Sequence, residues 1–435
     1  MARTARLLSW RLPHDLSDVE HTRRLGILAI LVNNLLMNFG FSIIIPLIAV
    51  HYTALPGFTA AAIGTVLALR QMAQQGLDLV GGMIADRIGA RTSIVVGCLV
   101  RAAGFLGIGL ATSMPELVAM ALLAGVGGAF FDAPGTAALA DLVMPEARQR
   151  VYALSATLAN VGTFLGPIAG VWLLHMSWQA VGIASAGVFV TISLLTRLLL
   201  PAHTLRREKA DHLLGVPGRS ALRQTLSLLL RDRIFLQMTA LTTGYWFLST
   251  QINISVPLVA ASLGGPRMVA VVFSVYAGMA IVLQYPVVRY LGARFSARVL
   301  LGASTACAGL GLALAVGMHS ILPLLIGIGL FAVARLQMQP TVNWVTSELA
   351  PQGQLGAYFG FGALSVAIGA GVGQITGGAL YDLSLQLHQP FLLAGTLLLV
   401  AAITSTGLLR AQLPVGHRRV EALETALEPE TEDLV

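Results

Sequence analysis

The stretch ANVGTFLGPIAG, residues 159–170, combines an apolar run with Gly162, Gly166, Pro167 and Gly170. In the interior of a soluble helix, a glycine costs about 1 kcal/mol and a proline about 3 kcal/mol relative to alanine. In a lipid bilayer both residues are tolerated, because neighbouring helices satisfy the freed backbone groups and small residues let two backbones approach. The stretch therefore predicts a tightly packed membrane helix.

The composition of the whole chain agrees with this interpretation. Of its 435 residues 56% are hydrophobic and only 11% are charged, and the mean hydropathy is +0.79. An ordinary soluble domain has roughly 25% charged residues. We expect no removable signal sequence, because the longest apolar patch in residues 1–24 spans only residues 7–10. The sequence predicts an all-α polytopic membrane protein.

Apolar runs of about 20 residues, the length that crosses a bilayer, recur along most of the chain. Charges and helix breakers divide these runs into twelve predicted transmembrane helices. Their ranges are 25–50, 59–85, 92–112, 115–141, 150–174, 178–200, 233–262, 267–291, 297–318, 321–348, 354–380 and 389–410.

With these helices, the chain is predicted to have five parts. Two bundles of six helices, residues 25–200 and 233–410, are joined by a basic cytoplasmic linker at residues 201–232. Residues 1–24 form a cytoplasmic segment, and the tail at residues 411–435, which ends in an acidic run, is predicted to be cytoplasmic and disordered.

The distribution of basic residues predicts the orientation in the membrane. Of the 27 Lys and Arg residues, Arg267 falls in a loop on the far side of the membrane from the termini, and Arg70, Arg101 and Arg335 fall within helices. All the others lie in loops or at helix ends on the side of the termini. Because cytoplasmic loops carry an excess of Lys and Arg, both termini are predicted to be cytoplasmic. The net charge of +7 then reflects orientation and not nucleic-acid binding.

The two halves of the chain repeat each other. SIIIPLIA, residues 42–49, returns as NISVPLVA, residues 253–260, which aligns Pro46 with Pro257. GTFLGPIAG, residues 162–170, returns as GAGVGQITG, residues 369–377, with Gln374 in place of Pro167. Two pseudo-symmetric six-helix bundles are expected of an alternating-access transporter with its substrate site between the halves.

Two motifs carry a resemblance to a family. GGMIADRIGART, residues 81–92, resembles the loop signature of the major facilitator superfamily through Gly82, Asp86, Arg87, Gly89 and Arg91. GTFLGPIAG resembles the antiporter signature of the drug exporters in that family, although Val171 replaces its second terminal glycine. LRQMAQQG, residues 69–76, and GYWFLSTQ, residues 244–251, resemble bacterial multidrug exporters of the family in particular. The resemblance implies the major facilitator fold and export against protons.

The resemblance also implies how the conformational switch works. The helix at 150–174 is expected to pack across the interface between the halves and to control closure; the alternative is a glycine packing groove with no gating role. Asp86 is expected to face the positive N-terminus of the helix at 354–380, with Arg87 and Arg91 facing Asp141. These contacts would form a latch on the cytoplasmic side, and the alternative is a set of charges that only define topology.

Charged residues inside the membrane are costly and by default functional. At 1.5 Å per residue, Asp78, Arg101 and Asp132 lie about 12, 15 and 13 Å from the cytoplasmic surface, and Arg70 lies about 12 Å beyond Asp78. A carboxylate between desolvation and a nearby arginine is suited to binding and releasing a proton. Asp132 is therefore the predicted proton carrier, and the alternative is a static ion cluster.

Polar side chains on two related helices predict the walls of a substrate cavity. Asn34, Asn38 and Phe41 share one face of the first helix. Trp246, Thr250 and Asn253 share one face of the seventh. They are expected to bind a lipophilic ligand, unless the amides only bridge helices. Arg335 is expected to meet an anionic substrate group, or otherwise a carbonyl or water.

The leading hypothesis is proton-driven efflux of lipophilic small molecules across a bacterial inner membrane. The alternatives are export of a metabolite, siderophore or lysolipid, and, less favoured, proton symport for uptake. No nucleotide loop, nucleophile and base cluster or metal-ligand spacing is found, so no enzyme, cofactor or metal is expected. The expected partners are a small-molecule substrate, protons and membrane lipid, without nucleic acid, and the chain is expected to be a monomer.

Overall fold

The computed structural model describes residues 18–131, 134–135, 138–139, 142–143, 145–200, 227, 229–351, 355–389 and 391–413. Within these ranges, regular secondary structure consists of α-helices and a short 3₁₀ helix. The predicted linker and both predicted terminal segments lie mostly outside the described residues.

The first half of the chain contains six long helices. They are α1 (Asp18–Thr53), α2 (Ala60–Ile88), α3 (Ala90–Leu110), α4 (Met114–Ala129), α6 (Pro145–Leu174) and α7 (Trp178–Leu199). Their boundaries agree with the predicted ones to within several residues, except that α4 ends well before the predicted residue 141. Only a few residues between 132 and 144 are described.

The second half of the chain has a matching set of elements. They are α10 (Arg233–Ser249), the 3₁₀ helix η2 (Thr250–Asn253), α11 (Ser255–Arg294), α12 (Ala297–Gly317), α13 (Ile321–Leu349), α14 (Leu355–Gln386) and α15 (Phe391–Arg410). The helix α11 is broken at Gly264 and Gly265, and Gly265 has a φ of +65° that favours glycine. Its first part, together with α10 and η2, corresponds to the predicted helix at 233–262.

Nine helices within the described residues are long and apolar enough to cross a membrane. Their outward faces expose large aliphatic side chains, as lipid contact requires. On α7 the exposed fractions are 77% for Leu198 and 55% for Leu194, and on α15 they are 62% for Ile403 and 60% for Leu399. A contiguous apolar surface of this kind marks membrane contact.

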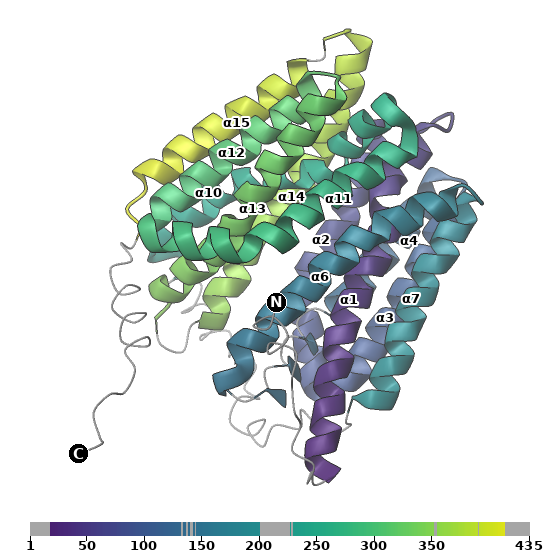
Figure 1. Ribbon diagram of the computed structural model, residues 1–435, viewed down its shortest axis with the longest axis vertical. Coiled ribbons are helices and arrows are strands. Elements are labelled where there is room, and N and C mark those ends of the chain that lie inside the picture. Colours follow the sequence, from purple (N-terminus) through teal and green to yellow (C-terminus); the bar gives the residue numbers. More distant parts are fainter. Residues whose placement is uncertain are drawn as a thin grey trace, which may run out of the picture.

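The helices form two groups with the same internal pairing (Figure 1). In the first group α1 packs on α6, α2 on α4, and α3 on both α4 and α7. In the second group α10 packs on α14, α11 on α13, and α12 on both α13 and α15. The pairs correspond one to one in chain order, so the sequence repeat is also a repeat of packing.

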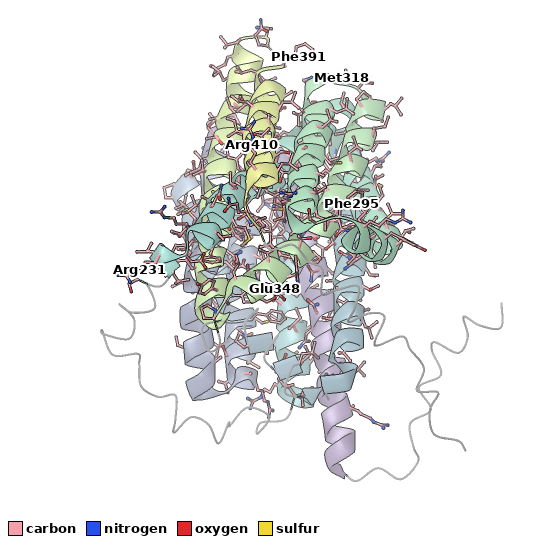
Figure 2. All side chains as sticks on the ribbon, turned by 90° about the vertical axis from the view of Figure 1, so that its left-hand side faces the viewer. Arg231, Phe295, Met318, Glu348, Phe391 and Arg410 are labelled. Atoms are coloured by element: carbon pink, nitrogen blue, oxygen red, sulfur yellow. The ribbon has the colours of Figure 1, made fainter. Side chains whose placement is uncertain are left out.

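Contacts between the groups run mainly through two helix pairs, α2 with α14 and α6 with α11. We name the side on which α1 begins and α15 ends the terminal side, and the other the distal side. The two groups diverge toward the terminal side in Figure 1. Figure 2 shows Phe391 and Met318 at the distal end of the second group, with Glu348 and Arg231 toward the other end.

Candidate functional site

The glycine stripe of α6 packs against α1. A Cβ atom built on Gly166 would lie 2.6 Å from the Cβ of Ser42 and 2.9 Å from the carbonyl oxygen of Phe39. Gly162 and Gly170 meet the backbone of α1 in the same way. The two helices therefore touch backbone to backbone within the first group. The expected packing of this helix across the interface between the halves uses another of its faces, because α1 occupies the face that the glycines leave bare.

A different face of α6 meets the second group. The Nδ2 of Asn160 donates a hydrogen bond to the Oε1 of Gln284 on α11, at 2.9 Å. One turn further along α6, the ring of Phe164 lies 3.7 Å from the position of a Cβ on Gly278. Helix α6 is thus held between α1 and α11. A movement of one half relative to the other therefore changes the contacts between α6 and α11.

The related stripe of α14 makes the corresponding contacts in the second group. A Cβ on Gly373 would lie 2.5 Å from the carbonyl oxygen of Phe247, and Gly369 and Gly377 also face α10 or η2. The Nε2 of Gln251 donates to the carbonyl oxygen of Gly373 at 2.8 Å. Both stripes therefore pack a helix against the first helix of its own group.

On its other side, α14 approaches α2 across the interface. A Cβ on Gly64 would meet the carbonyl of Gln374, and one on Gly378 would meet the carbonyl of Ala60. Met72 approaches Gly371 with its side chain and is 46% exposed. These close contacts extend from the distal end of α2 to its middle, so they hold the two groups together on the distal side.

A carboxylate completes this distal contact. Asp382, near the end of α14, accepts hydrogen bonds from the backbone N–H of Ala60 at 3.1 Å and of Ala61 at 2.8 Å. Thr59, the N-cap residue of α2, accepts from the N–H of Ala62 at 3.1 Å. A carboxylate at a helix N-terminus is stabilised both by these bonds and by the helix dipole. Asp382 was not among the predicted site residues, although an acidic residue just past the predicted helix end at residue 380 was a usable signal.

The loop motif between α2 and α3 is only partly described. Gly89 joins the two helices with a φ of +88°, which explains a glycine there. A guanidinium nitrogen of Arg91 donates to the carbonyl oxygen of Arg197 at the end of α7. The expected partner Asp141 lies outside the described residues, as do the side chains of Asp86 and Arg87. The backbone of Gly82 lies in α2.

Two buried arginines of the first group converge on one phenylalanine. Arg70 and Arg101 are 1% and 2% exposed, and their guanidinium carbons lie 5.0 and 5.6 Å from the ring centre of Phe41. Gln74 accepts a hydrogen bond from each, at 3.1 Å from Arg70 and 3.4 Å from Arg101. We name Arg70, Gln74, Arg101 and Phe41 the arginine cluster. The two guanidinium groups converge although their backbones lie at different predicted depths, because the long side chains close the gap.

Aromatic rings surround the rest of Arg101. Its guanidinium lies 5.7 Å from the ring centre of Phe105 and 5.3 Å from that of Phe189. Such cation–π contacts contribute about 2 kcal/mol each when desolvated. Asp78 lies half-buried on α2, and Asp132 lies outside the described residues. Gln74 was missed as a member, although it stands in the LRQMAQQG motif.

The asparagines of α1 bridge and brace helices. The Nδ2 of Asn34 donates to the side chain of Ser155 on α6 at 2.7 Å, and that of Asn38 donates back to the carbonyl of Asn34 at 2.8 Å. The structure therefore favours the bridging alternative over a ligand role for Asn34. Phe41, expected beside them in the cavity, belongs to the arginine cluster.

The predicted face of the seventh helix is interrupted. Helix α10 ends at Ser249, so Thr250 and Asn253 lie in the 3₁₀ turn η2 and do not continue the α-helical register of Trp246. Thr250 is buried, and its methyl packs against Gly373. Trp246 and Asn253 are half-buried. The three residues thus do not form one continuous wall.

Arg335 on α13 differs from the buried arginines. It is exposed, and its guanidinium carbon lies 5.5 Å from the ring centre of Tyr276 on α11. Tyr276 in turn stacks on Phe331 at 5.8 Å. Two helices of the second group, α11 and α13, thus contribute the arginine and the buried aromatic pair beside it.

Comparisons with solved structures agree with this architecture. The nucleoside transporter NupG, in a mutant form, aligns with a TM-score of 0.74 at 11% identity and covers 89% of this chain and 99% of its own. The POT family transporter PepTSo aligns with a TM-score of 0.69 at 16% identity, over 88% of this chain and 97% of its own. At these identities the likeness shows the fold alone.

Comparisons of sequence extend from the fold to the family. Multidrug resistance protein MdtH of Escherichia coli O9:H4 (strain HS) is 33% identical over 377 residues, which cover 86% of this chain and 91% of that protein. MdtH of strain K12 / DH10B matches with the same identity and coverage. The family model described as Major Facilitator Superfamily matches residues 30–264 and 238–431. Two matched halves, each with the same helix pairing, show that this chain belongs to the Major Facilitator Superfamily.

Proposed function

We propose that this chain exports lipophilic small molecules by alternating access in exchange for protons. The observation that carries the proposal is the 33% identity to the multidrug resistance protein MdtH over 86% of the chain. The interface supports the mechanism, because the two similar groups of described helices meet mainly along two helix pairs. Residues 25–200 and 233–410 act as the two moving bundles, and the chain works as a monomer in membrane lipid, without a cofactor.

The excess of basic residues on the terminal side assigns that side to the cytoplasm of a bacterial inner membrane. The contacts of Gly64, Gly378 and Asp382 then close the external side, while Met72, nearer the middle of α2, is exposed. The structure corresponds to the inward-facing member of the transport cycle. Alternating access requires a second state in which the external contacts open and the cytoplasmic ends meet.

Two carboxylates on the α2–α14 pair serve the two states. Asp382 of α14 binds the N-terminus of α2 externally. Asp86, near the cytoplasmic end of α2, serves the N-terminus of α14 when that side closes, as the family motif implies. The two helices thus exchange roles at opposite ends of one interface. A latch of a few kcal/mol suits a two-state switch, because it biases the equilibrium without freezing it.

Replacing Asp382 by Ala should shift the population toward the outward-facing state. Loss of a carboxylate cap costs about 1–2 kcal/mol, which changes the equilibrium about tenfold. The matched control is Thr59→Ala. The Thr59 side chain caps the same helix end, but the bond that it accepts lies within the first group. It should lower stability and leave the equilibrium unchanged. An equal shift in both variants would show that the cap acts only on helix stability.

The shift can be measured with one reporter cysteine at position 72, where Met72 is 46% exposed. Cys98 and Cys307, the only cysteines of the sequence, are first replaced by Ser. Inverted vesicles present the cytoplasmic side to an impermeant maleimide. Asp382→Ala should slow labelling several-fold at that side, because the outward-facing state covers this position.

Asp86→Asn should have the opposite effect on the same reporter. The substitution keeps the shape of the side chain but removes the charge that binds the N-terminus of α14. The inward-facing population should increase, and labelling at position 72 from the cytoplasmic side should become faster. Unchanged labelling would reduce the motif to a topology signal.

The proton is assigned to the first group. Arg70 and Arg101 place two cations in a buried position, and buried cations are stable only near anionic or hydrogen-bonding partners. Asp132 and Asp78 are the carboxylates at matching depth in the sequence. Asp132 binds and releases the proton in this proposal. The arginine cluster stabilises the ionised carboxylate of Asp132, so that the proton can leave it.

A second function is favoured by one observation. Arg335 is an exposed cation on a membrane-spanning helix, and a transporter of an anionic metabolite, siderophore or lysolipid would use such a group.

A panel of drug-susceptibility measurements separates the two functions. An efflux-deficient bacterium that expresses the chain should tolerate several unrelated lipophilic drugs at concentrations several-fold higher than the empty strain. Resistance to none of them would reject drug export.

A further inference from the structure

Helix α13 presents a polar stripe along one face. Arg335, Gln339 and Asn343 follow one another at intervals of four residues, and all three are exposed. Residues at this spacing lie above one another on an α-helix. The Nε2 of Gln339 donates to the Oδ1 of Asn343 at 2.9 Å, so the two amides form a continuous polar edge. We name these three residues the α13 stripe.

The α13 stripe does not face the lipid. Ile326, on the same helix, is 49% exposed, as expected of a lipid-facing position. Arg335 follows it by nine residues, about two and a half turns, so the two side chains leave opposite faces of the helix. An arginine in contact with hydrocarbon at the helix centre costs about 2.5–3.5 kcal/mol or more. The stripe is therefore exposed toward the inside of the transporter, between the two groups.

The surroundings of Arg335 favour binding of an anion. Within the described part of the chain, no carboxylate forms an ion pair with this guanidinium, whose carbon lies 5.5 Å from the ring centre of Tyr276. The side chain is exposed, so its N–H donors are accessible to a ligand. An arginine edge with neighbouring amides matches the geometry of a carboxylate or phosphate group.

The first helix of the second group offers one accessible aromatic ring. Trp246 is half-buried and packs edge-on against the buried Tyr245, with ring centres 5.3 Å apart. Tyr276 and Phe331 stack beneath Arg335, but they are 5% and 0% exposed, so they support the arginine and do not contact a ligand. A ligand that contacts both Trp246 and Arg335 is largely lipophilic, with its charge at one end.

We propose that the α13 stripe binds the anionic group of amphiphilic substrates, so that lipophilic molecules with a carboxylate or phosphate group form a preferred substrate class. The proposal rests on the proposed export function and adds the chemistry that the transporter selects. Arg335 binds the anionic group, the amides of Gln339 and Asn343 donate further hydrogen bonds, and the half-buried ring of Trp246 contacts the apolar body.

The test compares a fluorescent lipophilic dye that carries one carboxylate with its neutral primary amide. Fluorescence anisotropy of the purified full chain in a neutral detergent gives the Kd of each. The wild type should bind the carboxylate about tenfold more tightly, as expected for a hydrogen bond to a charged group. Arg335→Gln should remove this preference and leave the Kd of the amide unchanged, and Arg335→Lys should keep part of it.

The matched control is Arg267→Gln, which removes an exposed arginine of α11 far from the stripe in sequence and should leave both Kd values unchanged. Equal binding of both dyes by the wild type, or an equal loss of both in Arg335→Gln, would overturn the proposal. Phosphatidylglycerol is then added to the wild type. If it removes the preference for the carboxylate dye, the stripe binds a lipid headgroup, and the substrate assignment is overturned.

A failure of this inference can be told apart from a failure of the export function. Cells that export the neutral amide dye but show no preference for the carboxylate would contradict only the role of the α13 stripe. Cells that export neither dye and resist no drug would contradict the export function.

Discussion

Gly166→Leu should reduce transport to background while the protein still inserts into the membrane. Even a single Cβ atom added to Gly166 would lie 2.6 Å from the Cβ of Ser42 and 2.9 Å from the carbonyl oxygen of Phe39. A leucine cannot be accommodated by a side-chain rotation, because part of the obstruction is backbone. Helix α1 must move away from α6, and this displaces the face of α6 that carries Asn160 to α11. Export assays on cells with matched expression measure the effect.

The control for this variant is Gly187→Leu on α7. A Cβ on Gly187 meets nothing within 4 Å, so a leucine there enters open space. It adds the same apolar bulk to a membrane helix of the same group and should leave transport unchanged. Wild-type transport by Gly166→Leu, at equal expression, would show that the close contact of α1 and α6 is not required for the cycle.

Asp132→Asn should abolish accumulation of substrate against a gradient while exchange down a gradient persists. A proton carrier that cannot ionise leaves the substrate pathway intact but removes the driving force. Breaking one side of a purely structural buried ion pair, by contrast, costs about 3–5 kcal/mol and should lower the yield of folded protein. Uphill uptake and downhill exchange are measured on the same preparation of proteoliposomes.

Two further variants make the Asp132 experiment decisive. Asp132→Glu keeps a titratable carboxylate and should retain part of the uphill transport. If Asp132→Asn folds well only when Arg101 is neutralised too, the cluster is a static structural unit. Normal pumping by Asp132→Asn would move the proton to another group, and Asp78 is the next carboxylate to test.

The sequence was sufficient for the helices and for the family. The bilayer requires a run of about 20 apolar residues for each crossing, and charges and glycines mark where each run ends. The predicted range 178–200 corresponds to Trp178–Leu199, and 297–318 corresponds to Ala297–Gly317. The break between the seventh and eighth predicted helices lies at Gly264 and Gly265, where the backbone leaves the helical region.

The partners of each helix face could not be obtained in the same way. A glycine stripe predicts close packing, but Gly166 does not specify which helix comes close, and the structure assigns it to α1. The depths of Arg70 and Arg101 were counted along the backbone, and such a count does not show that their side chains meet at Phe41 and Gln74. The 3₁₀ turn after Ser249 changed the register of Thr250. These features depend on tertiary contacts, which periodicity does not report.

The most direct test of proton-coupled export uses proteoliposomes in which the cytoplasmic side of the protein faces the external buffer. The lumen is made acidic, and a lipophilic substrate is added outside, with a pH-sensitive dye trapped inside. The account predicts that the substrate accumulates in the lumen above its external concentration, and that its addition makes the lumen more alkaline as protons leave in exchange. Accumulation without proton release, or movement of substrate and protons in the same direction, would contradict it.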